Sequence, residues 1–122
     1  MIYGFDYWKT LSHHQKVLLP MIEALVKDGH KVYIISAAGK DREETTPQSI
    51  SELGLPEGVE VFMTIWEGDK HEDAPRLKYE KCKELGIDAF FDDRLDTCKY
   101  LSERGIACFQ SPFYKYFEET IL

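Results

Sequence analysis

The stretch IYGFDYWKTL, residues 2–11, places an aspartate directly after a short apolar run. Residues 1–5 have the length and the apolar character of a buried strand, and Asp6 follows at its end. Thr10 stands four residues further along the chain. The stretch therefore predicts an N-terminal strand whose carboxyl end carries a carboxylate and a hydroxyl group.

Four further apolar runs have strand length, and they alternate with stretches of helical spacing. The predicted strands are residues 32–35, 59–65, 89–91 and 106–109, and the predicted helices are residues 15–26, 48–53, 75–85 and 96–103. Strands that are apolar almost throughout and joined through helices predict a parallel sheet covered on both faces. We therefore expect an α/β fold, a three-layer, Rossmann-like, doubly wound sheet of about five strands.

Length and composition predict one folded domain spanning residues 1–122. The chain is 43% hydrophobic and 30% charged, which is typical of a globular protein and unlike a disordered one. No stretch approaches the roughly 20 apolar residues of a membrane span, and the N-terminus lacks the basic segment that opens a secretory leader. We expect a cytoplasmic protein with no membrane partner.

The net charge of -7 argues against a general nucleic-acid surface, although a local basic groove stays possible. Acidic side chains gathered in one cleft would instead favour a divalent cation. The three cysteines show no CxxC spacing, which predicts reduced thiols in the core and no zinc site.

Polar side chains stand at the ends of three predicted strands. Asp6 follows the first strand, Ser36 the second, and Asp92 with Asp93 the fourth. Lys78 lies early in the helix that precedes the fourth strand. Ligands of open parallel sheets bind beyond the carboxyl ends of the strands, so we expect these groups to converge. Carboxylates that hold a divalent cation, with a lysine and a hydroxyl for phosphate oxygens, suit phosphoryl transfer.

In their order along the chain, these residues resemble the four motifs of the haloacid dehalogenase superfamily in its minimal form, without a cap domain. The matching segments are GFDYWKT (4–10), VYIIS (32–36), KYEKCKELGIDAFFDDR (78–94) with its opening lysine, and FFDDRLD (90–96). The likeness covers almost the whole chain.

This resemblance implies a magnesium-dependent phosphohydrolase that acts through an aspartyl phosphate. Catalysis is assigned to Asp6, as the nucleophile, and to Lys78. Substrate binding is assigned to Thr10, Ser36 and Ala37. The Mg²⁺ ligands are Asp6, the Trp8 carbonyl, Asp92 and Asp93. The expected partner is a phosphorylated small molecule or the phosphorylated end of a macromolecule.

Trp8 departs from the family pattern. Phosphatases of the superfamily carry a second aspartate two residues after the nucleophile, where it protonates the leaving group. Tryptophan has no titratable side chain, and general acid-base catalysis contributes a factor of about 10² to 10⁴. We therefore expect reduced phosphatase activity.

One alternative is a catalytically inactive binding or regulatory protein of the same fold. A more distant one is a doubly wound ligand-binding domain without phosphate chemistry, although neither GxGxxG nor GxxxxGKS occurs in the sequence. The charged loops 40–46 and 67–73 are expected to set specificity. Trp8, Trp66 and the aromatic stretch 112–122 are expected to be packing surfaces in preference to a base-stacking platform.

Overall fold

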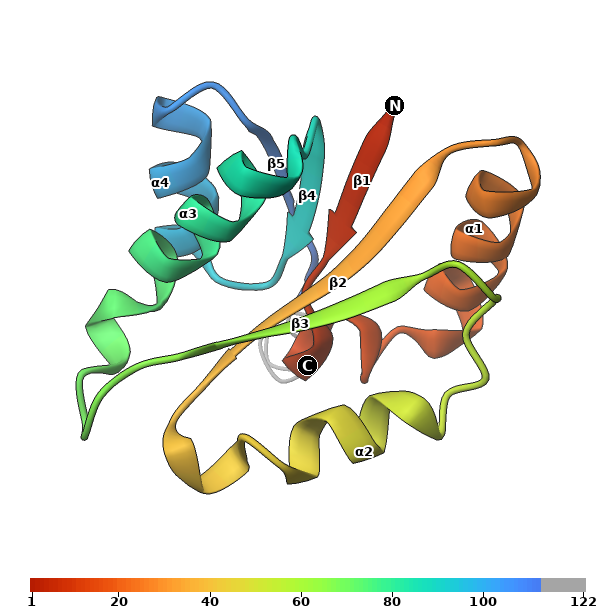
Figure 1. Ribbon diagram of the computed structural model, residues 1–122. Coiled ribbons are helices and arrows are strands. Elements are labelled where there is room, and N and C mark those ends of the chain that lie inside the picture. Colours follow the sequence, from red (N-terminus) through yellow and green to blue (C-terminus); the bar gives the residue numbers. More distant parts are fainter. Residues whose placement is uncertain (113–122) are drawn as a thin grey trace, which may run out of the picture.

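The computed structural model describes residues 1–112, which form a five-stranded parallel sheet with helices on both faces (Figure 1). The strands are β1 (Ile2–Phe5), β2 (Lys31–Ala38), β3 (Glu60–Ile65), β4 (Ala89–Asp92) and β5 (Ala107–Gln110), in the order β3-β2-β1-β4-β5. The helices are α1 (Gln15–Lys27), α2 (Thr45–Ser51), α3 (Ala74–Leu85) and α4 (Leu95–Glu103). The predicted α/β, doubly wound parallel sheet is confirmed.

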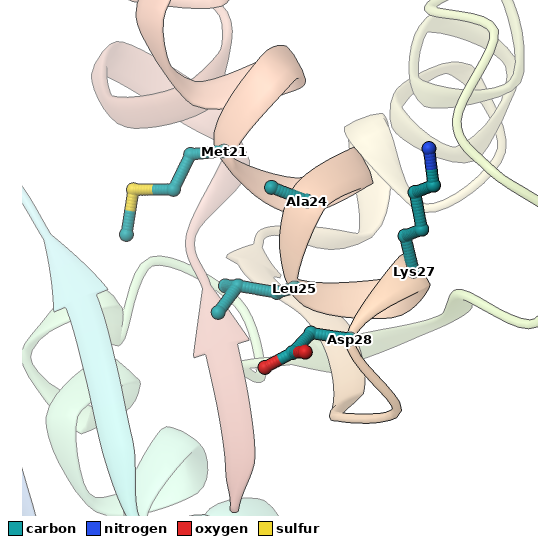
Figure 2. A pocket seen from close by; sticks show the side chains of 5 residues that line it. All are labelled: Met21, Ala24, Leu25, Lys27 and Asp28. Atoms are coloured by element: carbon teal, nitrogen blue, oxygen red, sulfur yellow. The ribbon is translucent and has the colours of Figure 1, made fainter.

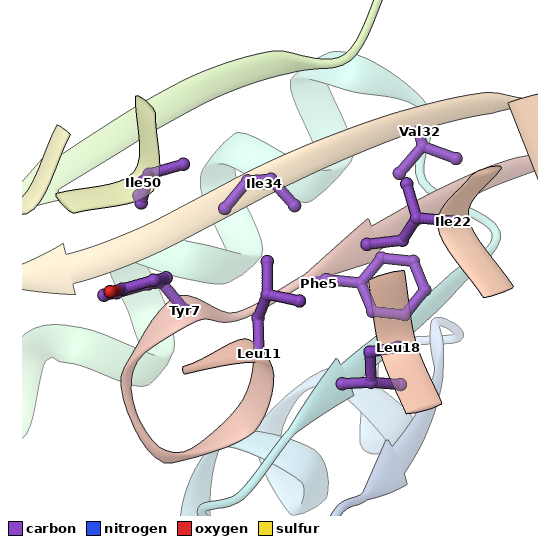
Figure 3. Close-up of a cluster of buried hydrophobic side chains, with 8 residues drawn as sticks. All are labelled: Phe5, Tyr7, Leu11, Leu18, Ile22, Val32, Ile34 and Ile50. Atoms are coloured by element: carbon purple, nitrogen blue, oxygen red, sulfur yellow. The ribbon is translucent and has the colours of Figure 1, made fainter. Parts of the chain in front are cut away.

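Each face of the sheet has its own apolar cluster. Helices α1 and α2 cover one face, and the buried side chains there are Phe5, Tyr7, Leu11, Leu18, Ile22, Val32, Ile34 and Ile50 (Figure 3). Helices α3 and α4 cover the other, over Ile35, Cys82, Ile87, Phe90, Leu101 and Ile106. The two clusters fix the sheet between the helices, as expected of a parallel sheet buried on both faces.

Pairing between β1 and β4 sets the position of two carboxylates. Phe5 pairs with Phe91, so Asp6 and Asp92 both stand one residue beyond that pair. The backbone N–H of Asp6 donates to the carbonyl of Phe91 at 2.9 Å. The strand order reverses at β1, because the chain proceeds through β2 and β3 on one side and returns to β4 on the other. The two carboxylates therefore lie at the switch point, where open sheets bind ligands.

Two predicted boundaries were wrong in ways that matter. Strand β2 continues past residue 35 to Ala38, because residues 36–38 keep pairing with β3. Ser36 is therefore inside the strand and does not end it. Helix α2 begins at Thr45, three residues before the predicted start at 48, because Pro47 falls in its first turn, where proline is tolerated.

The cysteines, the helices and the aromatic stretch can be compared with the sequence only as far as the described residues reach. All three cysteines are free thiols. No helix in residues 1–112 is both long enough and apolar enough to cross a membrane. The aromatic stretch that was predicted to be a packing surface lies, after Pro112, outside the described residues.

Gly4 makes a stability prediction possible, because it faces a core aromatic ring. A Cβ atom at Gly4 would lie 2.5 Å from Cδ1 of Phe90, which is fully buried. We expect Gly4→Ala to lower the free energy of unfolding by about 1–3 kcal/mol, as overpacking does, measured by urea denaturation. Val61→Ala, at an exposed position of β3, is the control and should cost less than about 1 kcal/mol. Equal losses in the two variants would contradict the steric explanation.

Candidate active site

A buried lysine joins two carboxylates at the carboxyl edge of the sheet. Lys78 Nζ lies 2.7 Å from Asp6 Oδ1 and 2.5 Å from Asp92 Oδ2. The exposed fractions of these residues are 3% for Lys78, 4% for Asp6 and 0% for Asp92. The predicted convergence of these three residues is therefore present in the structure.

Helical spacing explains why Lys78 faces inward. Ala74, Lys78 and Cys82 are four residues apart, and all three are buried on the face of α3 that packs against the sheet. Other basic residues of this helix pair with its own acidic residues, as Arg76 does with Glu80 at 2.9 Å. The choice of Lys78 from several nearby cations thus follows from its position in the helix.

Asp93 adds a third carboxylate. Asp6, Asp92 and Asp93 each present an oxygen within 4.8 Å of the others, and Asp93 is half-buried. Carboxylate oxygens are the ligands that hard divalent cations such as Mg²⁺ prefer. The cluster can therefore hold a metal ion.

The electrostatics of the cluster also favour a cation. Burial and the negative charge of Asp92 raise the pKa of Asp6 well above its ordinary value, although Lys78 acts in the opposite direction. Burial and Asp92 likewise raise the pKa of Asp93. Burial alone would lower the pKa of Lys78, but the charges of Asp6 and Asp92 raise it, so the lysine is an ammonium ion. One ammonium ion does not balance three carboxylates, and a bound cation would relieve the remaining repulsion.

Thr10 orients the carboxylate of Asp6. It lies in the helical turn η1 (Tyr7–Leu11), where Lys9 adopts a left-handed conformation with φ of 64°. The Thr10 hydroxyl donates to Asp6 Oδ2 at 3.3 Å and lies 3.1 Å from Ser111 Oγ. Thr10 is fully buried. Its contact is with Asp6, and its predicted role in substrate binding stays a prediction.

Ser36 and Ala37 differ in their surroundings. The Ser36 hydroxyl is buried and has no hydrogen-bond partner among residues 1–112, while Ala37 lines the pocket described next. A buried hydroxyl without a partner costs about 1–3 kcal/mol. Ser36 is fully buried and is not among the residues that line this pocket, so its role with phosphate stays a prediction.

A pocket of about 200 Å³ lies over the carboxylates. Of the predicted site residues, those that line it are Asp6, Trp8, Ala37, Lys78 and Asp93. Sequence reasoning did not assign Arg42, Trp66 or Arg94 to the site, yet all three also line it. Trp66 follows β3 directly, so the rule of inspecting strand ends could have identified it. Arg42 belongs to a loop that was expected to set specificity.

The larger hollow beside α1 is a different feature. It has a volume of about 670 Å³ and is lined by Met21, Ala24, Leu25, Lys27 and Asp28 (Figure 2). Its carboxylate, Asp28, lies 3.4 Å from the His30 ring. None of the predicted site residues lines this hollow, so the chemistry of the chain is concentrated at the sheet edge.

The pKa shifts predict that Asp93 destabilises the metal-free protein. A carboxyl group with a raised pKa binds its proton more tightly in the folded state. This tighter binding stabilises the folded state fully below the unfolded-state pKa of about 4, and the stabilisation is lost as the pH rises through the folded-state pKa. We expect Asp93→Asn to raise Tm by a few degrees at pH 7 in the presence of a chelator, and to leave it unchanged near pH 3. Thermal unfolding across this pH range checks it.

Asp96 provides a control, because its pKa is shifted in the opposite direction to that of Asp93. Partial burial raises the pKa of Asp96, but the hydrogen bonds and charge of Arg94 outweigh this and lower it. Arg94 Nη2 lies 2.6 Å from Asp96 Oδ2. Asp96→Asn should therefore lower Tm at pH 7 and have little effect near pH 3. Destabilisation by both variants at pH 7 would contradict the electrostatic account of Asp93.

Comparison with known proteins identifies the fold. No family model matches the chain, and no curated protein matches it. A chain in a structure of a Pnkp1/Rnl/Hen1 complex matches with a TM-score of 0.66 and 13% identity, over 92% of this chain and 46% of that chain. A chain in a structure of the Pnkp1/Rnl/Hen1 RNA repair complex matches with a TM-score of 0.63 and 13% identity, over 92% and 42%. The present chain thus spans less than half of each, and the likeness shows the fold they share.

Proposed function

We propose that this protein is a magnesium-dependent phosphohydrolase of the haloacid dehalogenase type, which cleaves a phosphate ester through an aspartyl phosphate on Asp6. The observation that carries the proposal is the Lys78 ammonium, bonded to both Asp6 and Asp92 beside a pocket. Asp93 completes a set of oxygen ligands around them.

The chemistry needs an ionised Asp6. Its carboxylate would attack phosphorus, forming an O–P bond as the bond to the ester oxygen breaks, and water would later hydrolyse the aspartyl phosphate. Lys78 keeps a positive charge next to Asp6, which favours the ionised nucleophile and offsets charge on the phosphate oxygens. The hydrogen bond from Thr10 restricts the orientation of the carboxylate.

A magnesium ion would be held by Asp6, Asp92, Asp93 and the backbone carbonyl of Trp8. Such an ion neutralises phosphate charge so that an anionic nucleophile can approach. The surplus of carboxylates over ammonium groups in the cluster supports its presence.

The substrate would be a phosphorylated small molecule or the phosphorylated end of a macromolecule. The net charge of -7 does not favour an extended nucleic-acid surface. The solved chains that share the fold come from complexes of which one is an RNA repair complex. This keeps a nucleic-acid end among the candidate substrates.

Trp8 supports a second candidate function, a binding or regulatory protein without catalysis. Its indole N–H donates a hydrogen bond to Thr46 Oγ1 at 3.2 Å. Tryptophan has no titratable group, so this position provides no general acid to protonate a leaving group. Alkoxide leaving groups would then depart unprotonated, at a cost of about 10² to 10⁴ in rate. The proposed enzyme must therefore be slow with ordinary alkyl phosphates.

Hydrolysis of an aryl phosphate tests the proposal, because a phenolate leaves without protonation more easily than an alkoxide. With Mg²⁺ present, we expect measurable release of the phenol by the native protein. Asp6→Asn should lower the rate at least about 10³-fold, because it removes the nucleophile. A steady-state spectrophotometric assay checks both values.

Trp8→Asp separates the two candidate functions. Restoring a carboxyl group at this position should raise the rate with alkyl phosphates more than with aryl phosphates. Activity in Trp8→Asp with none in the native protein would favour the inactive binding protein. Full activity in Asp6→Asn would disprove the assignment of the nucleophile.

Metal binding can be measured without turnover. A ligand present at 100 times its Kd stabilises the folded state by about 2.7 kcal/mol, which corresponds to a shift of several degrees in Tm. We expect Mg²⁺ to raise Tm of the native protein, and the increase to be much smaller in Asp92→Asn and Asp93→Asn. Sodium chloride at matched ionic strength is the control. The same increase with sodium chloride would rule out a specific cation site.

A further inference from the structure

Both tryptophans of the chain line the pocket over the carboxylates. The sequence contains two, Trp8 and Trp66, and they reach the pocket from the ends of β1 and β3. Both are half-buried, so part of each ring stays accessible. Trp8 also packs against the apolar cluster under α1. Packing alone therefore accounts for only part of their surface.

The indole of Trp8 is held in place from two sides. Its N–H donates to Thr46, and the guanidinium carbon of Arg42 lies 5.1 Å from the centre of the ring. Arg42 is exposed at the pocket, and within residues 1–112 no carboxylate forms an ion pair with it. An arginine stacked on an aromatic ring keeps its donors free for an anion.

Trp66 is held against the backbone that follows β2. The backbone N–H of Trp66 donates to the carbonyl of Ala38 at 3.1 Å, which sets the position of its main chain. A Cβ atom at Gly39 would lie 3.2 Å from Trp66 Nε1 and 2.9 Å from Asp41 Oδ1, so glycine permits this close approach. The second ring is therefore fixed before any ligand arrives, which lowers the entropy lost on binding.

We propose that this pocket selects phosphate esters of phenols, with the aromatic ring of the substrate placed against Trp8 and Trp66 and the phosphate at the carboxylate cluster. The inference rests on the proposed function and names its substrate class. Planar rings stack on indoles, whereas saturated groups of the same size do not gain that interaction. Arg42 adds positive charge at the pocket for the dianionic ester.

The size of the pocket favours a ring attached directly to the phosphate oxygen. Its volume of about 200 Å³ is below the roughly 300–1,000 Å³ of sites that enclose drug-sized ligands. A nucleotide places a sugar between its phosphate and its base, so it would need more room.

The leaving group points to the same class. A phenol has a pKa of about 10, as in tyrosine, so phenolate departs without the proton donor that Trp8 replaces. The residue that removes acid catalysis is thus the one that supplies a stacking surface. An ester of a phenol depends least on acid catalysis, and its aromatic ring gains most from the stacking surface.

A matched pair of phosphonates tests the inference on the native protein, because their P–C bonds are not hydrolysed. Phenylphosphonate carries a planar ring, and cyclohexylphosphonate carries a saturated ring of the same size. With Mg²⁺ present, we expect phenylphosphonate to bind about 5- to 150-fold more tightly, the range given by stacking on one aromatic ring, and to quench tryptophan emission. Calorimetry gives the affinities, and the emission of the two tryptophans gives the quenching.

Variants of Trp66 assign the effect to the ring. Trp66→Leu should reduce the preference for phenylphosphonate by about fivefold or more, because it removes one of the two stacking surfaces, whereas Trp66→Phe should keep most of it. Inorganic phosphate, which carries no ring, measures whether the remaining site is intact in each variant. If Trp66→Leu also loses binding of inorganic phosphate, its site has collapsed. The preference measured in Trp66→Phe then decides whether an aromatic ring at position 66 is responsible.

The outcomes separate the inference from the proposed function. Equal binding of the two phosphonates, together with binding of inorganic phosphate, overturns the inference and leaves the proposed function in place. Tighter binding of adenosine 5′-monophosphate than of phenylphosphonate also overturns it, in favour of a nucleotide site. Failure of phosphate and both phosphonates to bind overturns the two together.

Discussion

The carboxyl edge of this sheet depends on the buried ammonium group of Lys78. Moving a charged side chain out of water costs several kcal/mol even after relaxation, and only close pairing compensates for it. Lys78 pairs with Asp6 and Asp92 at 2.7 and 2.5 Å, and the pairing of β1 with β4 sets where those two carboxylates stand. Loss of the lysine would leave both of them buried without the ammonium group that they share.

Asp93 leaves the cluster with more carboxylate groups than the single ammonium group of Lys78 can pair. Lys78 already bonds two carboxylates, and the third adds repulsion; burial first, and repulsion between the carboxylates second, raise the pKa values of Asp6 and Asp93. A neutral side chain at position 93 would suit the fold better. Destabilising charge gathered beside a pocket is typical of functional sites, and its negative sign is the one that a cation can neutralise.

The sequence predicts the sheet and the convergence of Asp6, Asp92 and Lys78 because both follow from local patterns. Apolar runs that alternate with helical spacing determine a parallel sheet, and the spacing from Ala74 to Cys82 turns Lys78 inward. The surroundings of Ser36 could not be predicted in this way. They depend on how far β2 pairs with β3, and one residue of difference exchanges the faces of a strand.

In the proposed enzyme, Trp8 would affect catalysis and recognition together. The left-handed conformation of Lys9, uncommon for a residue with a side chain, helps set the path of the turn that carries the indole to Thr46 and Arg42. An aspartic acid at the same position could protonate a leaving group. It could neither stack on an aromatic ring nor hold the Arg42 guanidinium over an indole. In the proposed enzyme, the rate lost with alkyl leaving groups and the affinity gained for aromatic ones would have the same structural cause. Selectivity between those substrates should therefore exceed what either effect gives alone.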